Sequence, residues 1–275
     1  MKLHLHIKKP HSLILKAFYI FSLISILFIV ISSLYIRKVI YDIPSIDKLD
    51  EYTPSLTTHV YDINNKIIAE YSIEKRAMLT LDKIPLDLQN ALIAMEDRNF
   101  FKHWGISPKG IIRAFLRDIM HTKVAQGGST ITQQLSKLIF LKPERTLARK
   151  IKEIVLAFQI ERNFSKQEIL QMYFNQIYLG SGVYGVQSAS KVYFGKDVSQ
   201  LDLAECALLI GLIPSPEKYS PFNNPKAAET RRKLVLKSMY SEKFITKEEM
   251  EKALNEPLPQ SKFSQTTGIA PYFSE

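Results

Sequence analysis

Two adjacent carboxylates, Glu96 and Asp97, lie near the end of a predicted helix and are the first candidates for proton transfer. Three aromatic residues that follow them are placed to exclude water: Phe100, Phe101 and Trp104. The negative end of a helix dipole and the loss of water both raise the affinity of a carboxylate for protons. Glu96 therefore suits a general base, although these residues alone favour a solvated pair beside core aromatics. His103 fits a structural hydrogen-bonding role better than a catalytic one.

The stretch QGGSTITQQLSK, residues 126–137, forms a second candidate site. Thr130 and Gln133 have the spacing of a capping box, which predicts that a helix begins near Ser129 or Thr130. Helical spacing puts Thr130, Gln133 and Lys137 opposite four apolar residues: Ile131, Leu135, Leu138 and Ile139. The glycines and the free N–H groups of a helix start favour an anion, and Lys137 adds a positive charge. An ordinary capped surface helix fits the stretch equally well.

A third cluster lies in RTLARKIKEIVLAFQIER, residues 145–162. Helical spacing places Arg149 and Lys150 next to Glu153, and the two cations should keep this carboxylate ionised. Apolar residues take the other side of the helix: Leu147, Ile151, Ile154, Val155 and Phe158. Because Glu96 tends toward the protonated form, the two glutamates together resemble an acid/base pair. A solvated, salt-bridged helix face is the alternative.

A mainly α-helical body must position these clusters, since apolar residues recur at helical spacing from Pro85 to about residue 255. The predicted helices cover residues 86–97, 107–121, 130–140, 144–162, 166–178, 187–194, 200–213, 225–240 and 246–254. Before them, β-branched and aromatic residues over 58–81 predict a small β-hairpin with its turn at Asn64-Asn65. We expect residues 58–255 to form one domain, followed by a linker-like tail over 256–275.

The N-terminal segment predicts a single transmembrane helix. Residues 17–36 carry no charge, and at 1.5 Å per residue they span roughly 30 Å, the thickness of the bilayer hydrocarbon. Four basic residues precede this segment and two follow it, so the positive-inside rule favours a cytoplasmic tail over residues 1–16. Residues 37–57 are then a juxtamembrane connector to an exported domain.

The net charge of +10 does not indicate nucleic-acid binding. Six basic residues lie in and around the membrane segment before the first acidic residue, Asp42. Without these six, 31 basic residues face 27 acidic ones, a net charge of +4. We therefore expect no nucleic-acid partner. Cys206 is the only cysteine, so no internal disulfide is expected.

Five stretches together resemble the family 51 glycosyltransferases, the peptidoglycan polymerases that include the N-terminal domain of class A penicillin-binding proteins and the monofunctional transglycosylases. They occur in the family's order, at 96–105, 127–137, 149–161, 169–196 and 203–221. The resemblance implies a lysozyme-like, α-helical fold with a membrane-embedded jaw, for which residues 107–121 are the candidates. The sequence departs from the family pattern at Gln171, where glutamate is usual.

The resemblance also implies the chemistry. The family extends glycan strands from lipid II, a disaccharide-pentapeptide on a polyprenyl pyrophosphate, with inversion at the transferred sugar. By match to the family's motifs, Glu96 takes the proton from the acceptor 4-hydroxyl and Glu153 orients the leaving group or a divalent cation, Mg²⁺ or Mn²⁺. The residues expected to bind substrate are Asp97, His103, Ser129, Thr130, Gln133, Gln134, Lys137, Arg149, Lys150 and Asn175. The ligands of the cation are left open.

The resemblance places the chain in the bacterial cell membrane, with its catalytic domain periplasmic or extracellular. Its expected partners are lipid II, the growing glycan strand, membrane lipid, other cell-wall synthesis proteins and a separate transpeptidase. The S-x-x-K pattern of penicillin-acylated enzymes occurs at Ser45, Ser72, Ser188 and Ser215 without its partner motifs, so no transpeptidase activity is expected. The alternatives are a lytic transglycosylase, which lacks a pyrophosphate site, and a non-catalytic membrane scaffold for cell-wall assembly. The ending IAPYFSE also resembles the start of a linker to a transpeptidase domain, which leaves open a truncated bifunctional protein.

Overall fold

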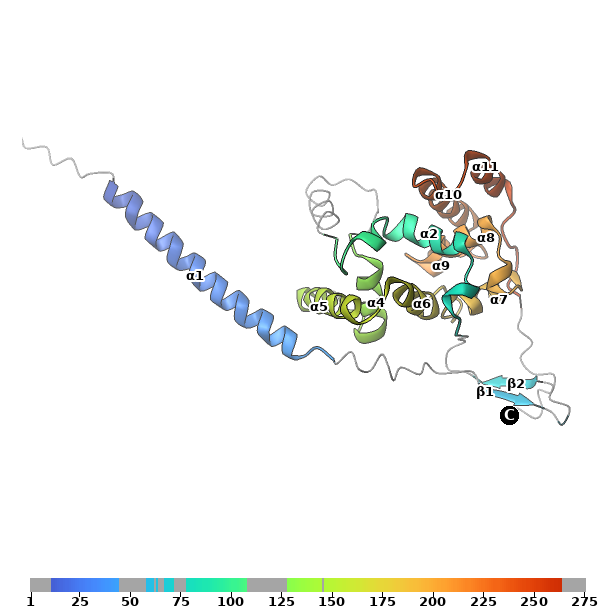
Figure 1. The fold of residues 1–275 in the computed structure, drawn as a ribbon, viewed down its shortest axis with the longest axis horizontal. Helices are drawn as coiled ribbons and strands as arrows, with labels where there is room; N and C mark the ends of the chain where they lie inside the picture. Colours follow the sequence, from blue (N-terminus) through green and yellow to red (C-terminus); the bar gives the residue numbers. More distant parts are fainter. Residues whose placement is uncertain are drawn as a thin grey trace, which may run out of the picture. The chain divides into compact units, whose positions relative to one another are not determined.

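The computed structural model describes residues 11–44, 58–61, 63, 67–71, 78–107, 128–144 and 146–263 (Figure 1). The chain divides into two compact units, of which one comprises Met1–Pro44 with Glu144–Lys152. The other comprises Ser45–Pro143 with Glu153–Glu275.

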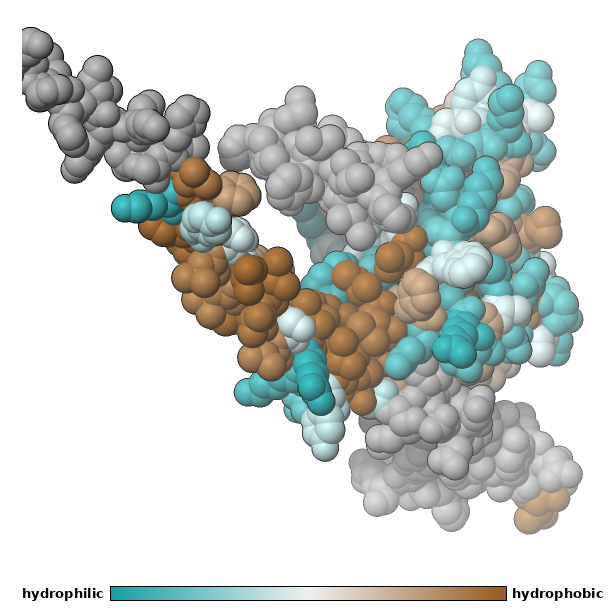
Figure 2. Space-filling model, turned by 60° about the vertical axis from the view of Figure 1, so that its left-hand side comes forward, coloured by the Kyte–Doolittle hydropathy of each residue, from teal (hydrophilic) through white to brown (hydrophobic). Residues whose placement is uncertain are grey.

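In the first unit, α1 (His11–Tyr41) is long enough and apolar enough to cross a membrane. Its large apolar side chains are exposed, and Figure 2 shows hydrophobic residues along most of its visible face. A helix whose long apolar stretch is not buried against the described residues of its own chain is typical of a membrane span. The helix extends beyond the predicted segment 17–36 at both ends. In the same unit, the Lys152 ammonium donates to the Asp42 carbonyl at 3.3 Å.

In the second unit, β1 (Thr58–Tyr61) and β2 (Ile67–Tyr71) pair antiparallel, with Thr58 opposite Tyr71 and Val60 opposite Ala69. The register shifts between Val60 and Tyr61. The predicted turn at Asn64-Asn65 lies outside the described residues.

The rest of the second unit is helical, in agreement with the mainly α prediction. Its elements are η2 (Leu81–Lys83), α2 (Leu86–Glu96), η3 (Phe100–Lys102), α4 (Ile131–Phe140), α5 (Leu147–Asn163, from Glu153 onward), α6 (Lys166–Gln176), α7 (Val186–Phe194), η4 (Val198–Gln200), α8 (Leu203–Leu212), α9 (Pro216–Tyr219), α10 (Pro225–Ser241) and α11 (Lys247–Asn255). The predicted helix over 107–121 lies outside the described residues from 108 onward. The predicted helix over 200–213 is instead the short η4 followed by α8, because Asp202 begins a new helix with its own capping box.

The core forms around α8, which is packed against both α2 and α10, while α11 covers α10 (Figure 1). Seven of its ten residues are apolar and buried, as expected for a helix that is hydrophobic all round: Ala204, Cys206, Ala207, Leu208, Leu209, Ile210 and Leu212. This packing fixes the C-terminal end of α2, where Glu96 lies. Helices α4 and α6 pack against each other and join the same core, and α4 supplies Gln134, the hydrogen-bond partner of Glu96.

Two helices present faces that differ from those predicted. On α4, Ile131 and Leu135 are buried as expected, but Gln133 is also buried and Leu138 is exposed. On α5, Leu147 and Phe158 are exposed although they belong to the apolar side. Glu153 is only 3% exposed, so the alternative that it belongs to a solvated helix face is wrong. Helical periodicity alone gives the faces of a helix but not which one is packed, and on α5 the packed side is the one that carries Glu153.

Candidate active site

Glu96 is the last residue of α2 and is half-buried. Its Oε2 accepts a hydrogen bond of 2.7 Å from the Gln134 side-chain amide on α4. Burial raises the pKa of Glu96 above its ordinary value, and the negative charge of Asp97 adds to this. The Gln134 hydrogen bond and the positive charges of Arg231 and Lys137 oppose the rise in pKa. The aromatic-rich sequence after Glu96 predicts this direction, and the structure shows that burial is its largest cause.

The orientation of Gln134 is set by Tyr173 on α6. The Tyr173 hydroxyl donates to Gln134 Oε1 at 2.9 Å, so the amide nitrogen must point toward Glu96. Tyr173 is fully buried, and burial together with the charge of Glu96 raises its pKa well above 10. A tyrosine with such a pKa keeps its proton and remains a donor. Tyr173 is absent from the residues predicted from the sequence, where its only signal is its place in the fourth matched stretch.

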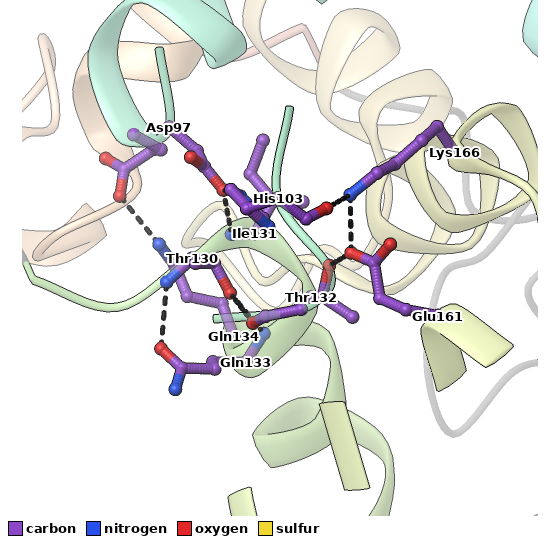
Figure 3. Close-up of polar contacts among 11 residues, drawn as sticks. Asp97, His103, Thr130, Ile131, Thr132, Gln133, Gln134, Glu161 and Lys166 are labelled. Atoms are coloured by element: carbon purple, nitrogen blue, oxygen red, sulfur yellow. Dashed lines mark hydrogen bonds and ion pairs between the residues drawn. The ribbon is translucent and has the colours of Figure 1, made fainter. Parts of the chain in front are cut away.

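Asp97, the C-cap of α2, joins two of the stretches that resemble the family, 96–105 and 127–137. Its Oδ2 lies 2.8 Å from His103 Nε2 and accepts the Ile131 backbone N–H at 3.1 Å (Figure 3). The carboxylate therefore sits at the N-terminal end of α4, where the helix dipole favours a negative charge. His103 and Asp97 are both more than nine-tenths buried. These contacts agree with the expected structural role of His103.

The predicted capping box at the start of α4 is present. The Thr130 hydroxyl accepts the Gln133 N–H at 3.1 Å, and Gln133 Oε1 accepts the Thr130 N–H at 3.0 Å. The Thr130 hydroxyl also donates to the Gly105 carbonyl at 2.6 Å. Gly105 has a φ of +83°, and a Cβ there would lie 2.8 Å from the Ala157 carbonyl oxygen on α5. Thr130 and Gln133 thus form hydrogen bonds within the protein that hold the start of α4 in place. Their contact with substrate stays a prediction.

A partly buried ion pair, Lys166–Glu161, supports this arrangement. Lys166 donates to Glu161 Oε1 and to the His103 carbonyl, both at 2.7 Å (Figure 3). Its ammonium also lies 4.4 Å from the Phe100 ring centre. The Thr132 hydroxyl on α4 donates to the same Glu161 oxygen at 2.6 Å. The pair therefore links α4, α5 and α6 to the segment after α2. Glu161 and Lys166 are five residues apart, but their bonds to Thr132 and His103 span 29 and 63 residues, so no local sequence pattern indicates those bonds.

The remaining charged candidates lie on α4 and α5. Lys137 is exposed and lowers the pKa of Glu96 by its charge, so the structure brings these two predicted residues together. The Ser136 hydroxyl donates to the Glu153 carbonyl at 3.3 Å, which places α5 against α4 one residue from Lys137. Arg149 and Lys150 lie one turn before Glu153 on α5 and are partly buried. Ser129 directly precedes the Thr130 cap and is partly buried.

Asn175 is 2% exposed and holds the chain before α2. Its side-chain amide accepts from the Leu79 N–H at 2.9 Å and donates to the Leu79 carbonyl at 2.8 Å. It also donates to the Gln171 carbonyl at 2.9 Å, while Gln171 Oε1 accepts the Leu81 N–H at 3.1 Å. Asn175 and the glutamine that replaces the family's usual glutamate therefore act together on one segment. The predicted contact of Asn175 with substrate is not among these bonds and stays a prediction.

Within the described ranges, no three His, Cys, Asp or Glu side chains are grouped so that they could hold a metal ion. Asp97 is already engaged with His103 and Ile131, and Glu96 with Gln134. The described residues therefore do not form a metal site made by the protein alone.

Comparison with known proteins matches residues 64–240 to the family model described as "Transglycosylase". The chain is 49% identical over 221 residues to penicillin-binding protein 1A of Aquifex aeolicus, covering 80% of this chain and 30% of that protein. Penicillin-binding protein 1A of Neisseria lactamica is 44% identical over 223 residues, with 81% and 28% covered. A crystal structure of penicillin-binding protein 1A from Haemophilus influenzae matches with a TM-score of 0.44 and 25% identity, over 77% of this chain and 22% of that one.

The chain thus spans less than a third of the length of these relatives. The matched region runs from the segment between β1 and β2 into α10 and includes every candidate site residue. The chain belongs to the transglycosylase family.

Proposed function

We propose that this chain is a peptidoglycan glycosyltransferase that polymerises lipid II into glycan strands for bacterial cell-wall synthesis. Membership of the transglycosylase family supports the reaction class. The observation that carries the proposal is the setting of Glu96, a half-buried carboxylate with a raised pKa that is held by Gln134 and Tyr173. A carboxylate whose pKa is raised toward the working pH is suited to accept a proton during sugar transfer.

In the proposed reaction, the acceptor 4-hydroxyl attacks C1 of the donor sugar and gives its proton to Glu96. The new C1–O4 bond forms as the bond from C1 to the pyrophosphate oxygen breaks, so the anomeric centre inverts and polyprenyl pyrophosphate leaves. Gln134 fixes the carboxylate by donating to Oε2, so the oxygen that is not bonded to Gln134 is the one available for the proton. Such positioning contributes to the reaction rate in addition to proton affinity, because the reacting atoms must be held within hydrogen-bond distance.

The leaving pyrophosphate requires positive charge beside Glu96. Lys137 supplies an exposed cation on α4, and Arg149 and Lys150 supply two more on α5, the helix that carries Glu153. We propose that these residues bind the donor with Gln134, and that Glu153 orients the leaving group. Asp97, His103, Ser129, Thr130, Gln133 and Asn175 are proposed to shape the substrate site.

The divalent cation that the family resemblance implies stays a proposal. Mg²⁺ commonly uses one or two carboxylates together with substrate phosphates and water, so a group of three protein ligands is not required. Glu153 is the carboxylate that we propose for this role. No step of the reaction above depends on it.

We propose that α1 anchors the chain in the bacterial cell membrane, with a cytoplasmic N-terminus and the β-hairpin and lysozyme-like domain outside. Membrane lipid, a separate transpeptidase and other cell-wall synthesis proteins are the proposed partners. Orientation can be tested with Lys233→Cys, at an exposed position on α10, because the native Cys206 is buried. A membrane-impermeant maleimide should label this variant in intact cells. Labelling only after lysis would show that the domain lies on the cytoplasmic side instead.

The function is tested with the purified full-length chain and lipid II, with product strands separated by gel electrophoresis. The wild-type protein should make polymer, and EDTA should reduce the yield if a divalent cation takes part. Glu96→Gln should lower the rate by about 10²–10⁴, the usual contribution of a positioned base. Cleavage of added polymer without elongation would favour the lytic alternative, and near wild-type polymerisation by Glu96→Gln would remove the proposed base.

A further inference from the structure

Arg231 on α10 is a buried cation that lies outside the five stretches that resemble the family. Its side chain is only 9% exposed, although arginine is rarely buried without a partner. Helix α10 packs against α8 and α2, so Arg231 lies on a helix that takes part in the packing that fixes the end of α2.

Two contacts hold the Arg231 side chain in place, beside a close approach of two helices. Its Nε–H donates to the Gly211 carbonyl on α8 at 3.3 Å. A Cβ at Gly211 would lie 3.3 Å from the Cβ of Arg231, so only glycine lets the two helices approach this closely without adjustment. The guanidinium carbon lies 5.1 Å from the ring centre of Tyr219, within the range of a cation–π contact.

One nitrogen of this guanidinium makes no hydrogen bond with the described residues. Among the described residues, the buried Nη2 of Arg231 has no hydrogen-bond partner. Leaving a buried donor unsatisfied costs free energy, so such a group calls for an explanation beyond packing. The charge of Arg231 acts on Glu96, where it opposes the effect of burial on the pKa.

The charges around Glu96 come from three helices, and a fourth helix contributes a neutral group. Arg231 on α10 and Lys137 on α4 favour its ionised form, whereas Asp97, next to Glu96 at the end of α2, favours the protonated form. Tyr173 on α6 is neutral and reaches Glu96 only through Gln134. Lys137 is exposed, so water and salt screen its charge, and a bound pyrophosphate would neutralise it. Arg231 is buried, so water and salt screen its charge less than that of Lys137.

We propose that Arg231 is a positioning residue for the glycosyl transfer, a permanent buried counter-charge that keeps Glu96 ionised and ready to accept the acceptor proton. This inference rests on the proposed role of Glu96 as the base. It adds a residue from α10 to a site otherwise built from α2, α4, α5 and α6, and it gives the close α8–α10 packing at Gly211 a function. The packing holds the guanidinium where its charge reaches the end of α2.

The test compares pH profiles of kcat/KM for lipid II polymerisation by the full-length chain. Arg231→Met keeps an unbranched apolar stem over Tyr219 but removes the charge, whereas Arg231→Lys keeps the charge without the planar group. Arg231→Met should lose about 3- to 10-fold in kcat/KM on the acid side and stay within about twofold on the alkaline plateau. The fall of kcat/KM at low pH, the acid limb of the profile, should be close to that of the wild type in Arg231→Lys.

Arg232 provides the matched control on the same helix. It is 3% exposed, and its Nη2 donates to the Glu256 carbonyl at 2.7 Å and to the Leu254 carbonyl at 3.4 Å. Its contacts therefore tie α10 to the end of α11 rather than to Glu96. Arg232→Met should lower the melting temperature without moving the acid limb.

The outcomes separate this inference from the proposed function. If Arg231→Met loses activity equally at all pH values, or has the wild-type profile, Arg231 does not act through the ionisation of Glu96 and the inference is overturned. It is also overturned if Arg232→Met moves the acid limb as far as Arg231→Met does. If Glu96→Gln polymerises lipid II at the wild-type rate, the proposed base is overturned instead. If Glu96→Gln is inactive but the pH profiles of Arg231→Met and the wild type run parallel, only the role of Arg231 is overturned.

Discussion

The Tyr173 hydroxyl and the Glu96 carboxylate are joined through one amide, that of Gln134. Tyr173 donates at 2.9 Å to the amide oxygen, and the amide nitrogen donates at 2.7 Å to Glu96. Because the hydroxyl is buried and its raised pKa keeps it protonated, it fixes which end of the amide meets the carboxylate. A residue on α6 therefore decides the hydrogen bond made by a residue on α2.

Tyr173→Phe should reduce polymerisation by about tenfold while keeping the fold, because the amide would be free to turn its oxygen toward Glu96. Removing the hydroxyl leaves Gln134 Oε1 without this donor, and the loss of stability should be about 1 kcal/mol. Tyr193→Phe is the matched control, since the Tyr193 hydroxyl is also buried and donates to the Leu179 carbonyl at 2.9 Å. Equal rate losses in the two variants, measured with chemical denaturation curves alongside, would show that Tyr173 acts only through stability.

The raised pKa of Glu96 predicts opposite effects of Glu96→Gln on stability and on activity. The folded state binds the proton more tightly than the unfolded chain, so the stability from this group is full below the unfolded pKa. That stability is lost as the pH rises through the folded pKa. At neutral pH, Glu96→Gln should therefore melt at the wild-type temperature or higher while it loses activity. The difference in melting temperature should shrink toward about pH 4, and a variant that melts lower at pH 7 would contradict the desolvation argument.

Local patterns predict the parts of this site that depend on neighbours in sequence. The Thr130–Gln133 capping box is complete within four residues, and both its hydrogen bonds are present. The α5 helix is also predicted, but its periodicity does not say that the side carrying Glu153 faces inward while Phe158 is exposed. That choice depends on α4, whose Ser136 meets the Glu153 backbone.

Contacts across long stretches of chain leave no sequence signal. Asn175 binds the Leu79 backbone from 96 residues away, and Gln134 binds Glu96 from 38 residues away. The family resemblance marks most of these positions, but it gives them contacts with substrate rather than with each other. Arg231 is not among the residues predicted from the sequence, because a buried arginine is recognised only once the helices around it are placed.

Gly105→Ala should destabilise the second unit by more than backbone strain alone. A side chain at a φ of +83° is strained, and the new Cβ would lie 2.8 Å from the Ala157 carbonyl oxygen. Gly182→Ala is the matched control, since Gly182 has a φ of +71° and a Cβ there would meet nothing within 4 Å. We expect a loss of about 1 kcal/mol for the control and about 2–4 kcal/mol for Gly105→Ala in urea denaturation. Equal losses would mean that α5 can move away from Gly105 at no cost.

Lys137→Ala should slow the turnover of a lipid pyrophosphate substrate without unfolding the protein. Lys137 is exposed in the last turn of α4, so its loss leaves no core cavity and costs about 0.5 kcal/mol through the helix dipole. The negative charge on the leaving group grows as the sugar bond breaks, and a fixed cation there stabilises the transition state more than the ground state. We therefore expect kcat and kcat/KM to fall together, by about 10²-fold.

Two further variants show whether position or charge alone accounts for the Lys137 effect. Lys137→Arg should recover only part of the rate, because a planar guanidinium does not occupy the place of a compact ammonium. Lys233→Ala removes another exposed lysine, from α10, and should leave the kinetics unchanged. Steady-state polymerisation kinetics and thermal melts on the three variants separate these effects. Full activity in Lys137→Ala would mean that the only exposed cation of α4 has no part in the reaction.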